Sequence, residues 1–406
     1  MSDEALIAEL ERQRESARQC FAYYDAIREG RGVLQERPKP DFSEITTSLI
    51  AVLKAHPVFG PGRRMFFAHK QLNLHPFWAV GGLLRVTVVS DAPSAVAWLH
   101  RLLEVDRADL RMVAVVHGLE VQDTVSLSNG VRLLPLAAAP DSPSLRSLAR
   151  QYNTPSFGME FAWMLPPTIA VLDMGTLAAS TDHTRGQAAH DSALGALLDA
   201  ARAFTLADHG APVVGTSWTD FVDPELTVAE PGQMWAGASF EGSLSRAYPL
   251  KVDGEGLAWA ERYLQMDGQL RRSMDVALDR LNLARRRRSP GDQAVDSGIC
   301  LEALLSGESS TQELTYKLRL RAALLLGTTL LERDEISRAV RDLYSLRSRV
   351  VHGGVRRPKD TLRDTQCASR GLEICTQAVR AIVQRNARPD FAKWELTGGP
   401  PESDGT

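Results

Sequence analysis

The sequence has few cysteines and no long apolar run. Its 406 residues include only four cysteines, none in a Cys-x-x-Cys pair or another metal-ligand pattern, which is typical of reduced cytosolic thiols. No apolar run approaches the roughly 18 residues needed to span a bilayer. The N-terminus lacks the basic and apolar segments of a signal peptide. We therefore expect a soluble, cytoplasmic protein with no membrane partner.

Several catalytic motifs are missing as well. The sequence contains no Gly-x-Ser-x-Gly elbow and no cluster of aspartates that would hold Mg²⁺. Residues 60–64 (Gly-Pro-Gly-Arg-Arg) lack the Gly-Lys-Ser/Thr of a phosphate-binding loop, so an ordinary loop is the better interpretation. His183, His190, Asp191 and His209 fit no metal-ligand spacing and are interpreted as helix-surface and loop residues. We expect neither a metal nor a cofactor.

Charge is distributed unevenly along the chain. The formal net charge is -3, but residues 260–395 hold 25 Lys and Arg against 18 Asp and Glu, a net charge of +7. A basic C-terminal part is the electrostatic pattern expected of a protein that binds a phosphate-rich ligand. An arginine-rich solvated helical surface would give the same count, so charge alone leaves both interpretations open.

Residues 1–240 have the pattern of a mixed α+β domain. Helical periodicity is found near the N-terminus, and Val125–Leu133 alternates apolar and polar residues around Asn129-Gly130, which predicts a β-hairpin. Prolines and serines at 140–143 predict an exposed loop. We predict helices over residues 4–29, 43–55, 95–105 and 188–206, and strands over 86–90, 112–116 and 168–171.

Strand signals nearly disappear after about residue 256. One long helix or two joined helices are predicted over 255–288, followed by helices over 292–305, 313–326, 334–352 and 361–384. The short links between them favour an antiparallel helical bundle over residues 255–390. Residues 391–406 are predicted to form a disordered tail.

The segment Leu343–Gly354 (Leu-Tyr-Ser-Leu-Arg-Ser-Arg-Val-Val-His-Gly-Gly) indicates function most directly. Leu343, Leu346 and Val350 mark the buried stripe of a helix that the Gly353-Gly354 pair would end. His352 then lies in the last turn. The negative end of the helix favours its charged form, and the nearby arginines oppose it. A histidine in such surroundings suits proton transfer near neutral pH.

Helix geometry distinguishes two arginines near His352. At about 100° per residue, Arg349 lies about 60° from His352 around the helix, whereas Arg347 lies about 140° away. Arg349 is therefore the closer neighbour within one helix. An active pair of Arg347 and His352 would require a distorted last turn or a site completed by a second chain. Taken alone, the segment is more simply interpreted as a solvated basic helix end.

Three ordered blocks in this part of the chain resemble the Apea-like branch of the HEPN superfamily. They are Asp296–Leu305, Glu313–Ala323 and Leu343–Gly353, and the third contains the Arg-x4-His motif as Arg347 and His352. The resemblance covers roughly residues 260–390. It implies a HEPN-like all-α bundle after the α+β region, and a metal-independent endoribonuclease whose site forms where two bundles pair as a homodimer.

The resemblance also assigns roles to individual residues. It implies that Arg347 and His352 are catalytic and that Glu302, in the first block, orients the arginine. Ser348 stands where many family members have Asn, Asp or His, and it keeps a polar side chain beside the phosphate. Arg349 and the run Arg285, Arg286, Arg287 and Arg288 are further candidates for RNA contact, although a solvated helix end explains the run at least as well.

Two functions follow from these patterns. In the first, the protein cleaves RNA, with tRNA as one candidate, through attack of the 2′-OH, and serves in defence against phage or as a toxin. Residues 1–240 would then sense a trigger or select the substrate. In the second, the bundle is an inactive RNA-binding or dimerisation module, and the N-terminal domain carries the activity.

Overall fold

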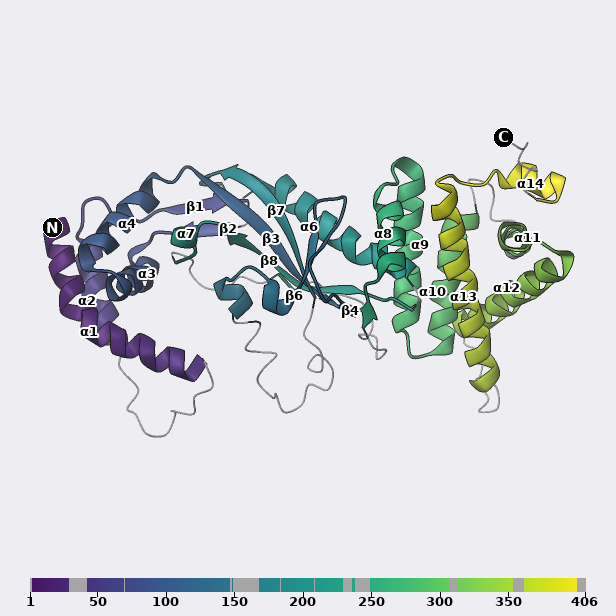
Figure 1. The fold of residues 1–406 in the computed structure, drawn as a ribbon, viewed down its shortest axis with the longest axis horizontal. Coiled ribbons are helices and arrows are strands. Elements are labelled where there is room, and N and C mark those ends of the chain that lie inside the picture. Colours follow the sequence, from purple (N-terminus) through teal and green to yellow (C-terminus); the bar gives the residue numbers. More distant parts are fainter. Residues whose placement is uncertain are drawn as a thin grey trace.

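The computed structural model describes residues 2–28, 42–68, 70–146, 148, 168–182, 184–207, 209–228, 236–237, 249–306, 313–352 and 361–399. The molecule is elongated. Helices of the N-terminal part lie at one end, a twisted sheet occupies the middle, and C-terminal helices form the other end (Figure 1). The α+β region followed by a helical region agrees with the sequence prediction.

Among the described residues, the N-terminal end has four helices and a short hairpin that contacts the central sheet. These elements are α1 (Asp3–Arg28), α2 (Phe42–Lys54), α3 (Pro76–Val89), α4 (Ala92–Glu104), β1 (Arg64–Phe67) and β2 (Lys70–Asn73). Leu6 and Leu10 of α1 and Leu49 of α2 are fully buried, at the spacing that places one helix face toward a core. They belong to a core separate from that of the C-terminal helices.

The strand predicted over residues 86–90 is wrong, because these residues end helix α3. The β-branched run Val86-Thr-Val-Val favoured a strand. However, His75 caps the helix start, Pro76 occupies its first turn, and Leu83 and Thr87 lie buried one turn apart. The Thr87 hydroxyl donates to the Leu83 carbonyl at 2.8 Å. Burial of this face outweighs the weak intrinsic preference of the β-branched residues.

In the described residues, the central sheet has six strands in the order β5-β6-β7-β3-β8-β9, and each neighbouring pair is antiparallel. Its strands and the short pair beside it are β3 (Arg107–His117), β5 (Val125–Ser126), β6 (Arg132–Pro135), β7 (Thr168–Ala178), β8 (Val213–Phe221), β9 (Ala236–Gly237), β4 (Leu119–Glu120) and β10 (Leu250–Lys251). The predicted hairpin around Asn129-Gly130 is confirmed, since Val125 pairs with Leu133 and Gly130 has a φ of 86°.

Strand β3 explains why the centre of the sheet is stable. Met112, Ala114 and Val116 point into the core shared with the C-terminal helices, whereas Val113 and Val115 point into a second core on the opposite face.

The loop predicted over residues 140–143 is exposed only in part. Following η1 (Leu136–Ala138), Ser142 is buried and its hydroxyl accepts the Leu145 N–H at 3.1 Å.

The last residue of β3, His117, should make stability depend on pH. His117 packs so closely on β8 that a Cβ added to Gly215 would lie 2.4 Å from its Nε2. Burial lowers the pKa of His117 below its usual 6.5, so the unfolded chain binds this proton more readily than the folded one. We expect the free energy of unfolding to fall as the pH drops below about 6.5. The decrease due to His117 reaches its full size below the folded-state pKa of this histidine.

Urea unfolding between pH 5 and pH 7.5 tests this expectation. His117→Gln should reduce the acid-side loss of stability, because glutamine does not titrate. His352→Gln serves as the control, because that histidine is exposed at a helix end on a different element. Identical pH profiles for wild type and His117→Gln would rule out this role.

Helix α6 (Gln187–Ala203) and η2 (Phe204–Leu206) connect the sheet to the C-terminal helices, and α7 (Pro224–Val228) follows β8. The C-terminal helices are α8 (Gly254–Leu264), α9 (Gly268–Arg286), α10 (Pro290–Leu305), α11 (Leu314–Leu326), α12 (Leu330–Val351), α13 (Thr361–Arg385) and α14 (Phe391–Thr397). Helix α10 packs against α9, α12 and α13, and α11 packs against α12. The single-helix alternative for residues 255–288 is excluded, because Gln265–Asp267 are not helical and separate α8 from α9.

Two features differ from the predicted domain limits. Residues 391–397 form helix α14 rather than a tail, because Phe391 and Trp394 are buried with their rings edge to face, 5.7 Å apart. One continuous core also joins the sheet face, α6 and the C-terminal helices, so no core boundary lies between residues 240 and 255. Among the helices described, none combines the length and apolar character of a transmembrane segment.

Candidate functional site

Arg347 and Glu302 come together between helices α12 and α10. Arg347 Nη1 donates to Glu302 Oε1, and both side chains remain about one-quarter exposed. The guanidinium also lies over the ring of Tyr344, 5.3 Å from its centroid. Two contacts therefore fix a cation that solvent still reaches.

Tyr344 also contacts the Glu302 carboxylate that holds Arg347. Its hydroxyl lies 3.0 Å from Glu302 Oε1 and 3.1 Å from the Gly298 carbonyl oxygen, and it can donate its one proton to either. Burial and the nearby Glu302 carboxylate raise the pKa of Tyr344 well above its usual range. The hydroxyl therefore stays protonated and acts as a donor to the carboxylate that holds Arg347.

Gly298 is required by the path of the Arg347 side chain. A Cβ added at this position would lie 2.9 Å from Arg347 Cδ, closer than real Cβ atoms approach. Gly298 stands four residues before Glu302, so both face α12 on the same side of α10. We refer to Gly298, Glu302, Tyr344 and Arg347 as the arginine clasp.

His352 lies at the exposed end of α12. Its backbone N–H donates to the Ser348 carbonyl at 3.0 Å and ends the helix. Within the described residues, no hydrogen bond or ion pair holds its imidazole. Gly353 and Gly354, which were predicted to stop the helix, lie outside the described residues. His352 is therefore available at the surface, one and a half turns from Arg347.

Arg349 does not pair with His352 as single-helix geometry suggested. Its Nη2 donates to Asp364 Oδ1 of α13 at 2.7 Å, and the Asp364 side chain is buried. Arg349 nevertheless remains half-exposed. Ser348 is exposed beside it. The structure therefore separates the two arginines: Arg347 is held by α10, and Arg349 by α13.

The run Arg285–Arg288 was open to two interpretations, an RNA contact or a solvated helix end, and the structure engages its first three arginines within the protein. Arg285 Nη1 donates to the carbonyl oxygens of Thr205 at 2.6 Å and Ala207 at 3.2 Å, and Arg285 Nη2 donates to the Thr376 hydroxyl at 2.9 Å. Arg286 is buried, and Arg287 Nε donates to the buried Asp296 at 2.8 Å. Of the four, Arg288 is the residue exposed to solvent.

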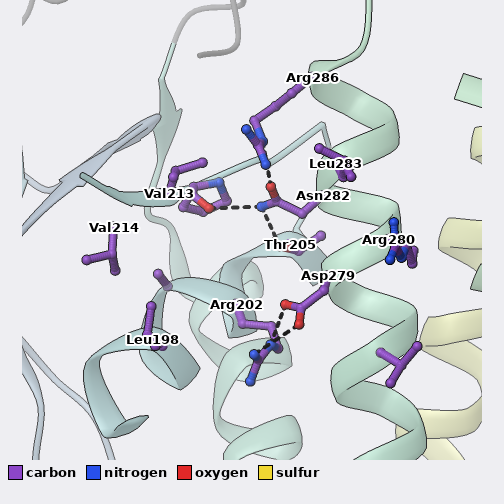
Figure 2. Close-up of a pocket in the computed structure, with 13 residues that line it drawn as sticks. Leu198, Arg202, Thr205, Val213, Val214, Asp279, Arg280, Asn282, Leu283 and Arg286 are labelled. Atoms are coloured by element: carbon purple, nitrogen blue, oxygen red, sulfur yellow. Dashed lines mark hydrogen bonds and ion pairs between the residues drawn. The ribbon is translucent and has the colours of Figure 1, made fainter. Parts of the chain in front are cut away.

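A cleft of about 460 Å³ lies between α6, β8 and α9 (Figure 2). Arg202 donates to both oxygens of Asp279, at 2.6 and 3.1 Å. The Asn282 amide donates to the Thr205 hydroxyl and the Pro212 carbonyl, and its oxygen accepts from Arg286 at 2.8 Å. These polar side chains of the cleft bond to one another and to the backbone, and they thereby join the sheet to the C-terminal helices.

The other histidine grouping does not form a site in the described part of the chain. His183 lies outside the described residues, and His190, Asp191 and His209 contribute to no group of three His, Cys, Asp or Glu that would hold a metal. The four cysteines are free of disulfides.

Two residues of this site carried a weak sequence signal, and a third carried none. Tyr344 stands three residues before Arg347, and Gly298 stands four before Glu302, so each shares a helix face with its partner. The spacing could have indicated both. Asp364 lies on a different helix from Arg349, and its role depends on tertiary packing that the sequence pattern does not show.

Comparison with known proteins identifies no relative: no family model, no curated protein and no solved structure matches this chain.

Proposed function

We propose that this protein is a metal-independent endoribonuclease of the HEPN type. One observation carries the proposal: the arginine clasp fixes Arg347, which remains partly exposed, on the same helix end as the exposed His352. Two ordered blocks of the family resemblance supply Glu302 and Arg347, and the fold brings these residues into contact. The HEPN-like arrangement of the helices is part of the proposal.

The chemistry follows from the two side chains. RNA carries its own nucleophile: the 2′-OH loses its proton, its oxygen attacks the adjacent phosphorus, and the 5′-oxygen leaves with a proton. His352 moves these protons, and Arg347 stabilises the negative charge on the phosphate oxygens. Glu302 accepts from one Arg347 nitrogen and orients the rest of the planar group. The products are a 2′,3′-cyclic phosphate and a 5′-hydroxyl.

A homodimer formed through the C-terminal bundle would complete this site. One histidine cannot easily remove one proton and deliver another at the same moment, whereas two copies of His352 can divide these tasks. The exposure of Val351 and His352 at the end of α12 leaves them accessible to a second chain. RNA, with tRNA as one candidate, is the proposed substrate, and phage defence or a toxin-like role is the proposed setting.

A second candidate is an inactive RNA-binding or dimerisation module, with the activity carried by the N-terminal domain. The same clasp favours it, because an ion pair between α10 and α12 over a buried tyrosine is also an ordinary way to hold two helices together. The two candidates differ in one respect: only the nuclease requires His352.

Incubation of the purified full-length chain with total RNA in EDTA separates these functions. Wild type should cleave, and His352→Ala should cleave about 10²- to 10⁴-fold more slowly, because it lacks the proton carrier. Arg341→Ala is the matched control, since Arg341 is exposed on the same helix and forms an ion pair with Asp342 beside it. Cleavage ends should carry a cyclic phosphate.

Two results would contradict the nuclease proposal. One is cleavage that His352→Ala retains in full. The other is intact RNA after incubation with wild type, including incubation with phage components, while binding persists. The second result would favour the inactive module.

A further inference from the structure

One stretch of the N-terminal part contains no acidic residue. Between Glu44 and Asp91 the sequence has no Asp or Glu, although the chain holds 50 of them. The same 46 residues contain five Lys and Arg, at positions 54, 63, 64, 70 and 85. A locally positive segment in a chain of net negative charge favours a polyanionic partner.

The fold gathers part of this segment at one surface. Arg63 and Arg64 lead into β1, and the Arg63 carbonyl accepts from the Leu74 N–H at 2.9 Å, so the two arginines lie beside the start of α3. His75 caps that helix, and its backbone lies against Gly62. Both arginines and His75 are exposed. The Arg63 guanidinium donates to the Leu103 carbonyl at 3.3 Å, whereas the Arg64 guanidinium has no hydrogen bond or ion pair among the described residues.

Two aromatic side chains stand exposed in the first turn of α3, directly after the cap residue His75. Phe77 and Trp78, in the first turn of α3, are 60% and 44% exposed, and their rings meet edge to face at 5.1 Å. Their neighbours on the helix, Ala79 and Val80, are buried. A Cβ added to Gly81, one turn further along the exposed face, would contact nothing within 4 Å. The rings therefore border open space rather than a packed core.

We propose that Arg63, Arg64, His75, Phe77 and Trp78 form a platform that binds single-stranded RNA. Exposed aromatic rings beside arginines are the combination on which unpaired bases stack while the phosphates contact the cations. Duplex RNA hides the faces of its bases and lacks the stacking contact. A protein or membrane partner would use the apolar rings, but it gives no reason for a 46-residue segment free of carboxylates.

The proposal rests on the proposed ribonuclease function and adds where its substrate is held. The platform and the end of α12 lie toward opposite ends of the long axis of the molecule, with the sheet between them (Figure 1). A strand that reaches both places must be long. We therefore expect the platform to govern the KM for long single-stranded RNA and to leave the kcat unchanged, because it holds the RNA away from the reacting bond.

Binding of labelled single-stranded and duplex RNA of equal length to the full-length chain tests the platform. Phe77→Ala/Trp78→Ala should weaken single-strand binding about tenfold or more and reduce the preference for single strands over duplex. Arg64→Ala should weaken both equally and reduce the salt dependence by about one phosphate contact. Tyr316→Ala is the matched control, because Tyr316 is also 60% exposed but lies on α11.

Binding is measured in the His352→Ala background as well, so that the platform and the nuclease can fail separately. Platform-dependent binding without cleavage by wild type would support the platform and reject the nuclease. Unchanged single-strand affinity in the double variant would overturn the platform, even if RNA is cut. Binding of the chain to phosphatidylserine vesicles through Phe77 and Trp78, with no RNA binding, would overturn it in favour of a membrane surface.

Discussion

Replacement of Arg347 with alanine is expected to slow RNA cleavage about 10²- to 10³-fold and to leave the fold intact. Loss of one group that stabilises developing charge in a transition state has an effect of this size. Arg347 is about one-quarter exposed and bridges α10 and α12 through Glu302, so its removal should change stability far less than activity. Single-turnover cleavage of a defined RNA measures the first effect, and urea unfolding measures the second.

Three further variants test whether the clasp, rather than charge alone, determines activity. Arg347→Lys should recover only part of the rate, because a lysine lacks the planar fork. Glu302→Gln should be slower than wild type, since the anion that orients Arg347 is lost. Gly298→Ala should be slower as well, because its Cβ would displace Arg347 Cδ. Equal rates for Arg347→Lys and wild type would contradict a role for guanidinium geometry.

Local patterns predicted most helices of the C-terminal part. Apolar spacing located α10 to α13 to within a few residues. The start of α12 was placed four residues late. It begins at Leu330, where Thr329 and Glu332 form a reciprocal cap that the sequence displays as Thr-x-x-Glu. The end of α3 was misassigned because tertiary burial outweighed β propensity.

The candidate site was predictable where one helix face determines it. Glu302 and Arg347 were found through ordered blocks, and the structure brings them into contact. The partner of Arg349 was not predictable, because Asp364 lies on another helix. The arginine run shows the same limit. Composition indicates four cations, but only packing shows that Arg285 faces carbonyl groups and that Arg288 faces water.

Arg285→Ala is expected to lower the free energy of unfolding by about 2–4 kcal/mol, although the sequence suggested an RNA contact. The Arg285 guanidinium donates to the carbonyl oxygens of Thr205, Ala207 and Gly210 and to the Thr376 hydroxyl. Each carbonyl left without a donor costs about 1–3 kcal/mol, with water able to satisfy some of them. The residue thus joins the end of α6 to helices α9 and α13.

Arg288→Ala provides the matched comparison within the same run. Arg288 is exposed, so its removal should lower the free energy of unfolding by no more than about 0.5 kcal/mol. Urea unfolding measures this change. If RNA contacts this helix end, Arg288→Ala should weaken binding and reduce its salt dependence by about one phosphate contact. A destabilised Arg288→Ala with a stable Arg285→Ala would contradict this assignment. A destabilised Arg285→Ala, together with a stable Arg288→Ala that binds RNA more weakly, would show that one basic run serves two roles. Its first arginine would hold the α6–α9 junction, and its last would contact a polyanion.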